Sequence, residues 1–168
     1  SSAASDVYKR QGERCQVTIK LDEKGRVALP ARLRRKLKES GVNAVVLTFF
    51  DGGIRGFAPN HFVERIEGPI AQRDPFDPET QLLHHAVLAG AEDCPIDGQG
   101  RIRLPARLRE ECGLESEATL ISMLDWIEIW PPDRWEARRK QALDARAKKL
   151  SGTSVSYTHL TLPTRRFV

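Results

Sequence analysis

Two groups of residues combine an aspartate, a glycine and an arginine at the same spacing. They are Asp22, Gly25 and Arg26 and, 75 residues later, Asp97, Gly100 and Arg101. A glycine permits a sharp turn, across which the aspartate can pair with the arginine four residues after it. One interpretation is a salt bridge that clamps the turn and aims the following strand. The other is that the pair holds the guanidinium toward DNA, and both can be true because a fixed arginine binds better than a mobile one.

The two groups belong to a longer internal repeat. Residues 22–34 and 97–109 are identical at nine of thirteen positions and share the pattern D-x-x-G-R-x-x-L-P-x-x-L-R. Two copies are too few for a solenoid, so we expect a pseudo-dimer within one chain. The motif residues expected to shape each copy are Asp22, Gly25, Leu29, Pro30, Asp97, Gly100, Leu104 and Pro105.

Each copy predicts a strand, a glycine turn, a second strand, a short helix and a β-hairpin. Val17, Ile19 and Leu21 alternate with polar residues, which is typical of a half-buried strand. In the short helix, Leu33 and Leu37 are four residues apart and can both face a core. The hairpin strands are expected at residues 44–50 and 54–58 and at residues 118–123 and 126–130.

The rest of the chain is expected to connect and extend these two copies. We expect a first unit at residues 14–62, a helical linker at 63–91, a second unit at 92–135 and a C-terminal helix at 136–153. Within the linker, the glycine and prolines of residues 68–77 predict an irregular connection, and Asp77 followed by Pro78 predicts a helix start. Residues 1–11 and 154–168 resemble translated adapter or vector sequence and are expected to lie outside the fold.

The distribution of charge points to a nucleic-acid partner. Residues 17–38 hold eight basic and two acidic residues, a net charge of +6, whereas residues 97–111 hold four basic and three acidic residues, a net charge of +1. An arginine-rich helix start beside a turn favours contact with DNA phosphates over a merely solvated face. The expected DNA-binding residues, with the first copy dominating, are Arg26, Arg32, Arg34, Arg35, Lys36, Arg101, Arg107 and Arg109.

Catalytic, metal and membrane functions are not expected. Asp22 and Asp97 could form the proton-sharing pair of a hydrolase, but the arginine four residues after each keeps its carboxylate ionised. Cys15, Cys94 and Cys112 lack the C-x-x-C spacing of a metal site, so no metal or other cofactor is expected. No apolar run approaches the roughly 18 residues of a membrane span.

The D-x-x-G-R-x-x-L-P-x-x-L-R motif resembles that of the SpoVT–AbrB swapped-hairpin family of bacterial DNA-binding proteins. Two copies about 75 residues apart, each followed by helices, with Ile-Glu-Ile-Trp near the end, resemble the MraZ family over roughly residues 14–146. The resemblance implies an α+β fold, mainly β, in which two AbrB-like units form one swapped-hairpin β-barrel. It also implies a cytoplasmic, nucleoid-associated regulator of the cell-division and cell-wall gene cluster that binds G-rich promoter direct repeats as a ring-shaped homo-oligomer.

A structural oligomer that makes no specific DNA contact is the alternative function. Trp126, Trp130 and Trp135 cluster around the second hairpin and the final helix. Core packing is the simpler interpretation of these tryptophans, and an oligomer interface is the other.

Overall fold

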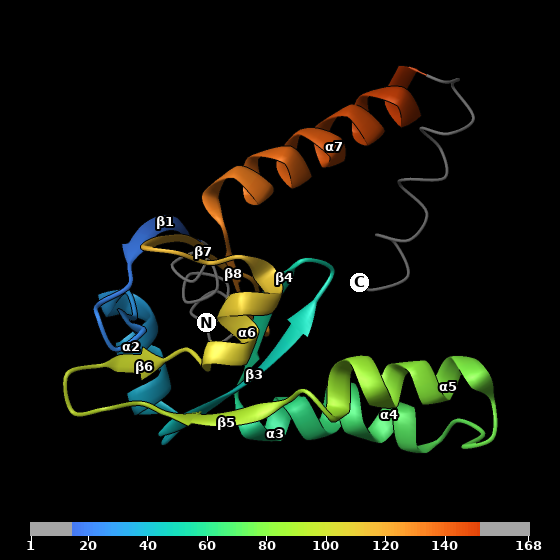
Figure 1. Cartoon of the computed structure of the whole chain (residues 1–168), viewed down its shortest axis with the longest axis horizontal. Helices are drawn as coiled ribbons and strands as arrows, with labels where there is room; N and C mark the ends of the chain where they lie inside the picture. The colour runs from blue at the N-terminus through green and yellow to red at the C-terminus, as the bar shows by residue number, and fades with distance from the viewer. Residues whose placement is uncertain (1–14, 152–168) are drawn as a thin grey trace, which may run out of the picture. The chain divides into compact units, whose positions relative to one another are not determined.

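The fold was analysed in a computed structural model that describes residues 15–151. The first repeat contributes β1 (Cys15–Lys20), β2 (Arg26–Ala28), α2 (Ala31–Glu39), β3 (Ala44–Phe50) and β4 (Gly53–Phe57). The second repeat contributes β5 (Glu92–Pro95), β6 (Arg101–Arg103), α6 (Ala106–Cys112), β7 (Glu117–Ser122) and β8 (Ile127–Trp130) (Figure 1). The terminal stretches interpreted as adapter or vector sequence, 1–11 and 154–168, lie outside the described residues.

The strands of the two repeats are exchanged. They form a six-stranded sheet in the order β1-β7-β8-β4-β3-β5 and a two-stranded ribbon of β2 and β6. Only the hairpins β3–β4 and β7–β8 pair within one repeat, whereas β1, β2, β4 and β5 each pair with a strand of the other repeat. The α+β class and the exchange of strands between two repeats are therefore confirmed.

The strand order is the same when the repeats are interchanged, so the chain has an internal pseudo-two-fold axis. Val27 lies opposite its counterpart Ile102 at the centre of the ribbon. In the sheet, Arg55 of β4 lies opposite Glu128 of β8 at the centre of that pairing. The helix α6 has seven residues and α2 has nine, so the hairpin residues of the second repeat follow their counterparts in the first by 73 positions, not 75. Arg55 and Glu128 are therefore counterparts.

The core lies between the sheet and the ribbon. Val27 and Ile102 of the ribbon are fully buried, as are the motif leucine Leu104 and Leu47 of the sheet. The helices contribute unequally, because Leu108 and Cys112 of α6 are fully buried whereas Leu33 and Leu37 of α2 are half-buried. In the edge strand β1, Ile19 is buried as predicted. Val17 is not, since 36% of its surface is exposed.

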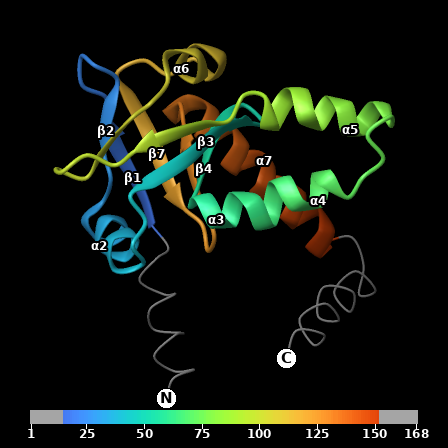
Figure 2. The ribbon, with the colours of Figure 1, turned by 90° about the horizontal axis from the view of Figure 1, so that it is seen from below.

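A helical arm, residues 59–88, connects the repeats. It consists of α3 (Pro59–Phe62), the π-helix η1 (Val63–Glu67), α4 (Gly68–Ala71), α5 (Pro78–Leu83) and the π-helix η2 (His84–Leu88). Two views agree that its two helical runs lie side by side and project from the sheet (Figures 1 and 2). The hydroxyl of Thr48 in β3 donates a hydrogen bond of 2.8 Å to the Val87 carbonyl and ties the arm to the sheet.

The irregular connection predicted at residues 68–77 is wrong for its first four residues. Gly68–Ala71 form α4, which continues directly from η1. The Gly68 N–H donates to the Val63 carbonyl five residues earlier, and this wider turn accommodates Pro69, which has no N–H to donate. The helix start at Asp77 is confirmed, because the Asp77 side chain accepts a hydrogen bond of 3.2 Å from the Thr80 N–H.

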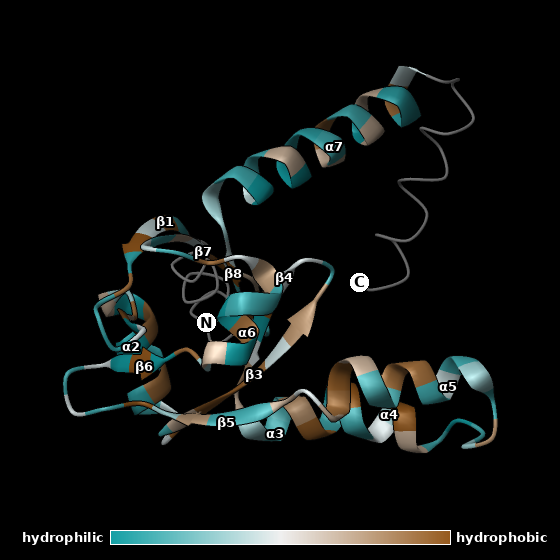
Figure 3. Cartoon of the chain, in the orientation of Figure 1, coloured by the Kyte–Doolittle hydropathy of each residue, from teal (hydrophilic) through white to brown (hydrophobic). Residues whose placement is uncertain are grey.

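The chain divides into two compact units after Pro132, and the second unit contains the helix α7 (Pro132–Ser151) from Asp133 onward. This helix begins four residues before the predicted position 136. Its residues are mostly polar, as the colouring in Figure 3 shows. No helix within residues 15–151 is both long enough and apolar enough to cross a membrane.

Candidate nucleic-acid interface

The Asp22 carboxylate organises the turn of the first repeat. Its Oδ1 atom accepts hydrogen bonds of 2.9 Å from the N–H groups of Lys24 and Arg26. The Gly25 N–H donates to the Asp22 carbonyl at 2.9 Å, and Gly25 has a φ of 74°. That conformation lies in the left-handed region, where glycine has no Cβ to clash. The turn therefore requires both the acceptor side chain and the glycine.

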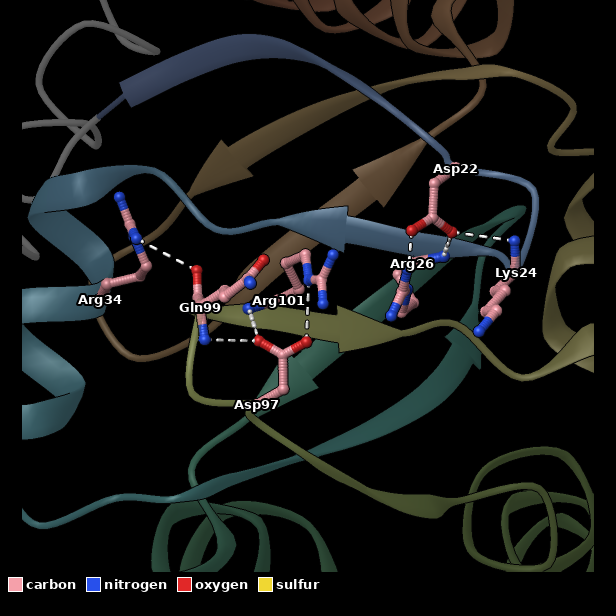
Figure 4. Close-up of polar contacts among 7 residues, drawn as sticks. All are labelled: Asp22, Lys24, Arg26, Arg34, Asp97, Gln99 and Arg101. Atoms are coloured by element: carbon pink, nitrogen blue, oxygen red, sulfur yellow. Dashed lines mark hydrogen bonds and ion pairs between the residues drawn. The ribbon is translucent and has the colours of Figure 1, made fainter.

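The second repeat builds the same turn around Asp97. Its Oδ1 atom accepts hydrogen bonds of 2.9 Å from the N–H groups of Gln99 and Arg101, and Gly100 has a φ of 72°. Figure 4 shows the two turns on either side of the β2–β6 ribbon. Two segments 75 residues apart thus adopt one geometry, as the repeat predicts.

Both turns hold an arginine by a charged hydrogen bond. The Arg26 Nε atom lies 2.6 Å from Asp22 Oδ2, and the Arg101 Nε atom lies 2.8 Å from Asp97 Oδ2. These contacts confirm the predicted salt bridges. Because only Nε of each guanidinium is used in these contacts, the Nη groups remain to bind another partner, and the side chains of Arg26 and Arg101 are 29% and 28% exposed.

The turn geometry lowers the pKa of both aspartates. For Asp22, the hydrogen bond from the Arg26 backbone N–H is the largest cause, and the Arg26 guanidinium and the Lys24 N–H add to it. For Asp97, the Arg101 backbone N–H is the largest cause, followed by the Arg101 guanidinium and the Gln99 N–H. Each donor stabilises the charged carboxylate, so both groups stay ionised at neutral pH. A proton-sharing pair of carboxylates needs the opposite shift.

The lowered pKa values predict a pH dependence of stability. A carboxylate whose folded pKa lies below its unfolded pKa stabilises the fold above the ordinary aspartate value of 3.8, and this stabilisation is lost as the pH falls through the folded pKa. The double variant Asp22→Asn and Asp97→Asn keeps a turn-forming acceptor but removes the charge. We expect its urea midpoint to lie below that of the wild type at pH 7 and to converge with it in acid. Midpoints with a constant separation across this range would contradict the assignment.

The solvent-facing side of the ribbon carries three arginines. Val27 and Ile102 point into the core, so the flanking residues point outward. These outward residues are Arg26, Ala28, Arg101 and Arg103, with Arg26 opposite Arg103. The Arg103 side chain is exposed and makes no hydrogen bond or ion pair with another described residue. A two-stranded β-ribbon has the width to enter the major groove of B-DNA.

Arg103 was not among the predicted DNA-binding residues. The sequence does indicate that Arg103 faces outward. Arg101, Ile102 and Arg103 alternate between polar and apolar in a segment predicted as a strand, so Arg103 shares the face of Arg101. The first repeat has Ala28 at the equivalent position, so a search for residues shared by both copies passes over Arg103.

The helix arginines fall into three groups. The side chains of Arg32 and Arg35 of α2 are exposed, and neither side chain forms a hydrogen bond or an ion pair within residues 15–151, whereas Lys36 is half-buried. Arg107, the counterpart of Arg32, donates to the Gly90 carbonyl at 2.9 Å and lies 3.4 Å from Glu92. Arg34 and Arg109 lie against the glycine turn of the opposite repeat. DNA contact by the helix residues stays a prediction, as does the dominance of the first copy.

Cys94 and Cys112 are buried and pack in the hydrophobic core. Burial raises the pKa of the Cys94 thiol to about 11, with the charges of Glu92 and Asp93 adding to the shift. Cys94 is therefore protonated at neutral pH. The Cys112 thiol is buried and donates to the Leu108 carbonyl at 3.0 Å. Across the described part of the chain, no three His, Cys, Asp or Glu side chains are grouped as metal ligands would be.

Comparison with known proteins supports the repeat and the motif. The family model described as "MraZ protein, putative antitoxin-like" matches residues 15–77 and 87–153. These two regions make up more than half of the chain, and each contains one copy of the glycine-turn motif. The chain belongs to the MraZ family. The resemblance drawn from the duplicated motif is thereby confirmed.

Several MraZ proteins are similar to the chain over most of their length. "Transcriptional regulator MraZ" of Lachnoclostridium phytofermentans is 34% identical over 141 residues, which cover 82% of this chain and 94% of that protein. The protein of the same name from Thioalkalivibrio sulfidiphilus is 34% identical over 123 residues, which cover 73% of this chain and 82% of the relative. Both relatives carry a name that describes control of transcription.

Proposed function

We propose that this MraZ family member is a sequence-specific DNA-binding transcriptional regulator. The observation that carries the proposal is the outward face of the β2–β6 ribbon, where Arg26, Arg101 and Arg103 lie together over a fully buried Val27–Ile102 pair. The names of the relatives support a role in transcription. The target proposed here is a set of G-rich direct repeats in a promoter of the cell-division and cell-wall gene cluster, and the location is the cytoplasm at the nucleoid.

Binding would begin with electrostatic attraction. Arg32 and Arg35 of α2, with Lys36, are placed near the ribbon by the motif itself, since the helix starts two residues after Leu29. Each phosphate that such a residue neutralises contributes about −0.9 to the slope of log affinity against log salt concentration. This step positions the protein but does not depend on the DNA sequence.

Base recognition would follow from the ribbon. An arginine that donates to O6 and N7 of guanine discriminates against the wrong base by about 1–3 kcal/mol. The aspartates support this role because they hold Arg26 and Arg101 through Nε and leave the terminal nitrogens available. Several copies in a ring-shaped homo-oligomer would add their contacts on matched repeats and turn weak binding into tight binding.

A titration of the full chain tests the proposal. Two DNA duplexes, one with G-rich direct repeats and one with the same bases shuffled, are compared at two salt concentrations. We expect tighter binding to the repeats and weaker binding to both duplexes at the higher salt concentration. Equal affinity for the two duplexes would contradict sequence-specific recognition and leave only electrostatic binding.

Assembly without specific DNA contact is the second candidate function. The observation that favours it is Phe76, at the tip of the helical arm, because 85% of this large apolar side chain is exposed. Trp130, in contrast, is buried, which agrees with core packing. A folded oligomer that binds neither duplex, and that dissociates when Phe76 is replaced by serine, would support this second candidate.

A further inference from the structure

Each glycine turn lies beneath an arginine of the opposite repeat. A Cβ atom on Gly25 would lie 2.7 Å from Arg109 Cζ and 2.9 Å from Arg109 Nε. A Cβ atom on Gly100 would overlap Cδ of Arg34 and lie 3.0 Å from its Nε. The positive φ favours glycine at both positions, and a side chain there would also displace the opposite arginine.

Each of these arginines also donates a hydrogen bond to a backbone carbonyl. Arg34 Nη1 donates to the Gln99 carbonyl at 3.2 Å, the contact drawn in Figure 4. Arg109 Nε donates to the Leu104 carbonyl at 3.1 Å. The Leu104 N–H in turn donates to the Gly25 carbonyl at 2.9 Å. Arg34 thus hydrogen-bonds to the second turn directly, whereas Arg109 covers Gly25 of the first turn and bonds to Leu104, whose own N–H donates to Gly25.

The contact occurs twice with the repeats exchanged. Arg34 and Arg109 occupy the last position of the motif, and Gly25 and Gly100 occupy its fourth position. In each case the helix of one repeat covers the turn that holds the ribbon arginine of the other. Arg34 is thereby coupled to the turn of Arg101, and Arg109 to the turn of Arg26.

We propose that Arg34 and Arg109 are positioning residues for DNA recognition, each holding in place the ribbon arginine of the opposite repeat. The inference rests on the proposed DNA-binding function and assigns these two arginines an indirect part in it. Packing over the opposite glycine and, for Arg34, a hydrogen bond to the turn restrict the turn backbone. A restricted turn keeps the aspartate–arginine pair aligned with the groove. The two halves of the interface are consequently coupled, since each repeat orders the reading residue of its partner.

Amide hydrogen exchange of the free full-length chain tests the coupling without DNA. Arg34→Ala should speed exchange of the Gly100 and Arg101 amides about fivefold, the effect of one lost hydrogen bond, and leave the amides of the first turn unchanged. Arg109→Ala should speed exchange of the Gly25 and Arg26 amides, because it uncovers Gly25, and leave the amides of the second turn unchanged. Arg35→Ala, beside Arg34 on α2, is the matched control and should change neither turn. Exchange that rises in both turns equally, or in neither, overturns the inference.

Two further substitutions separate packing from charge. Arg34→Met keeps the aliphatic stem over Gly100 but removes the charge and the hydrogen bond to the Gln99 carbonyl, so its turn should exchange at a rate between those of the wild type and Arg34→Ala. Gly100→Ala should disorder the same turn, because its Cβ would displace Arg34, whereas Gly98→Ala two residues away has open space and should not. If Arg34 binds phosphate directly, the Met and Ala variants lose equal affinity for DNA, which overturns the positioning role.

Pairs of substitutions then test the route to DNA. Adding Arg34→Ala to Arg101→Ala should cost no further affinity for the repeat duplex, because the arginine that Arg34 positions is already gone. Adding Arg34→Ala to Arg26→Ala should lower the affinity for the repeat duplex by the same factor as Arg34→Ala does in the wild-type chain. Additive losses in both pairs overturn the inference. A wild-type chain that binds neither duplex overturns the proposed function itself. That result is distinct from the failure of the coupling, in which the arginine variants do not change amide exchange in the turn of the opposite repeat.

Discussion

Simultaneous replacement of Arg26, Arg101 and Arg103 by alanine should lower the affinity for G-rich direct repeats by at least about 100-fold. The three arginines form the outward face of the ribbon. If each contributes about 1 kcal/mol, the low end for an arginine on guanine, the sum corresponds to this factor at about 1.4 kcal/mol per tenfold. A fluorescence anisotropy titration with the repeat duplex at fixed salt concentration measures the change.

The matched control removes the same charge elsewhere. Arg65 on the arm and Arg139 and Arg146 on α7 are exposed, and their replacement by alanine should weaken binding far less. The single variant Arg103→Ala adds a cleaner comparison, because Arg103 pairs with no aspartate among the described residues and its loss leaves both turns intact. If the ribbon variant and the control variant bind alike, the ribbon is not the reading surface.

Replacement of Glu128 by alanine should lower the free energy of unfolding by about 3 kcal/mol. Glu128 accepts hydrogen bonds from the indole N–H groups of Trp126 at 3.0 Å and Trp130 at 2.8 Å. Arg55 Nε lies 3.3 Å from the same carboxylate, and its guanidinium lies 3.9 Å from the centre of the Phe50 ring. Removing the carboxylate leaves two indole donors and one half-buried cation without their acceptor. The estimate is at the low end for a broken buried pair because the Arg55 side chain is 24% exposed.

Urea unfolding followed by tryptophan fluorescence measures this loss. Glu128→Gln is the matched control, because its amide oxygen still accepts one indole hydrogen bond, and it should destabilise the chain less than Glu128→Ala.

The Arg55–Glu128 pair also shows how the two repeats differ. Arg55 and Glu128 are counterparts that meet at the pseudo-two-fold axis, where identical residues would place two like charges opposite each other. An alanine variant as stable as the wild type would contradict the role of this network.

The turn and the strands around it follow from local chemistry. Asp22, Gly25 and Arg26 predict the turn because glycine permits the positive φ and the aspartate can accept from the N–H groups that follow it. Alternation around Val27 and Ile102 predicts which residues point inward. The helices α2 and α6 end just before Gly41 and Gly113, where glycine tolerates the positive φ that both residues adopt.

Partners across the repeats could not be predicted from local patterns. Nothing in β2 itself shows that it pairs with β6, so the opposition of Arg26 and Arg103 needs the three-dimensional fold. The same holds for Arg34, whose spacing places it on an exposed helix face but whose side chain reaches the turn at Gln99. The helical course of Gly68–Ala71 was missed because the wide turn that admits Pro69 is a feature of the backbone.

Protection of guanine N7 from methylation by dimethyl sulfate tests the central claim most directly. Guanine N7 lies in the major groove, where the ribbon arginines would donate to it. We predict that the full-length chain protects guanine N7 in each direct repeat and that Arg103→Ala loses part of this protection, while Arg65→Ala retains it. Tight binding to the repeats with every guanine N7 still reactive would contradict recognition of guanine edges by the β2–β6 ribbon.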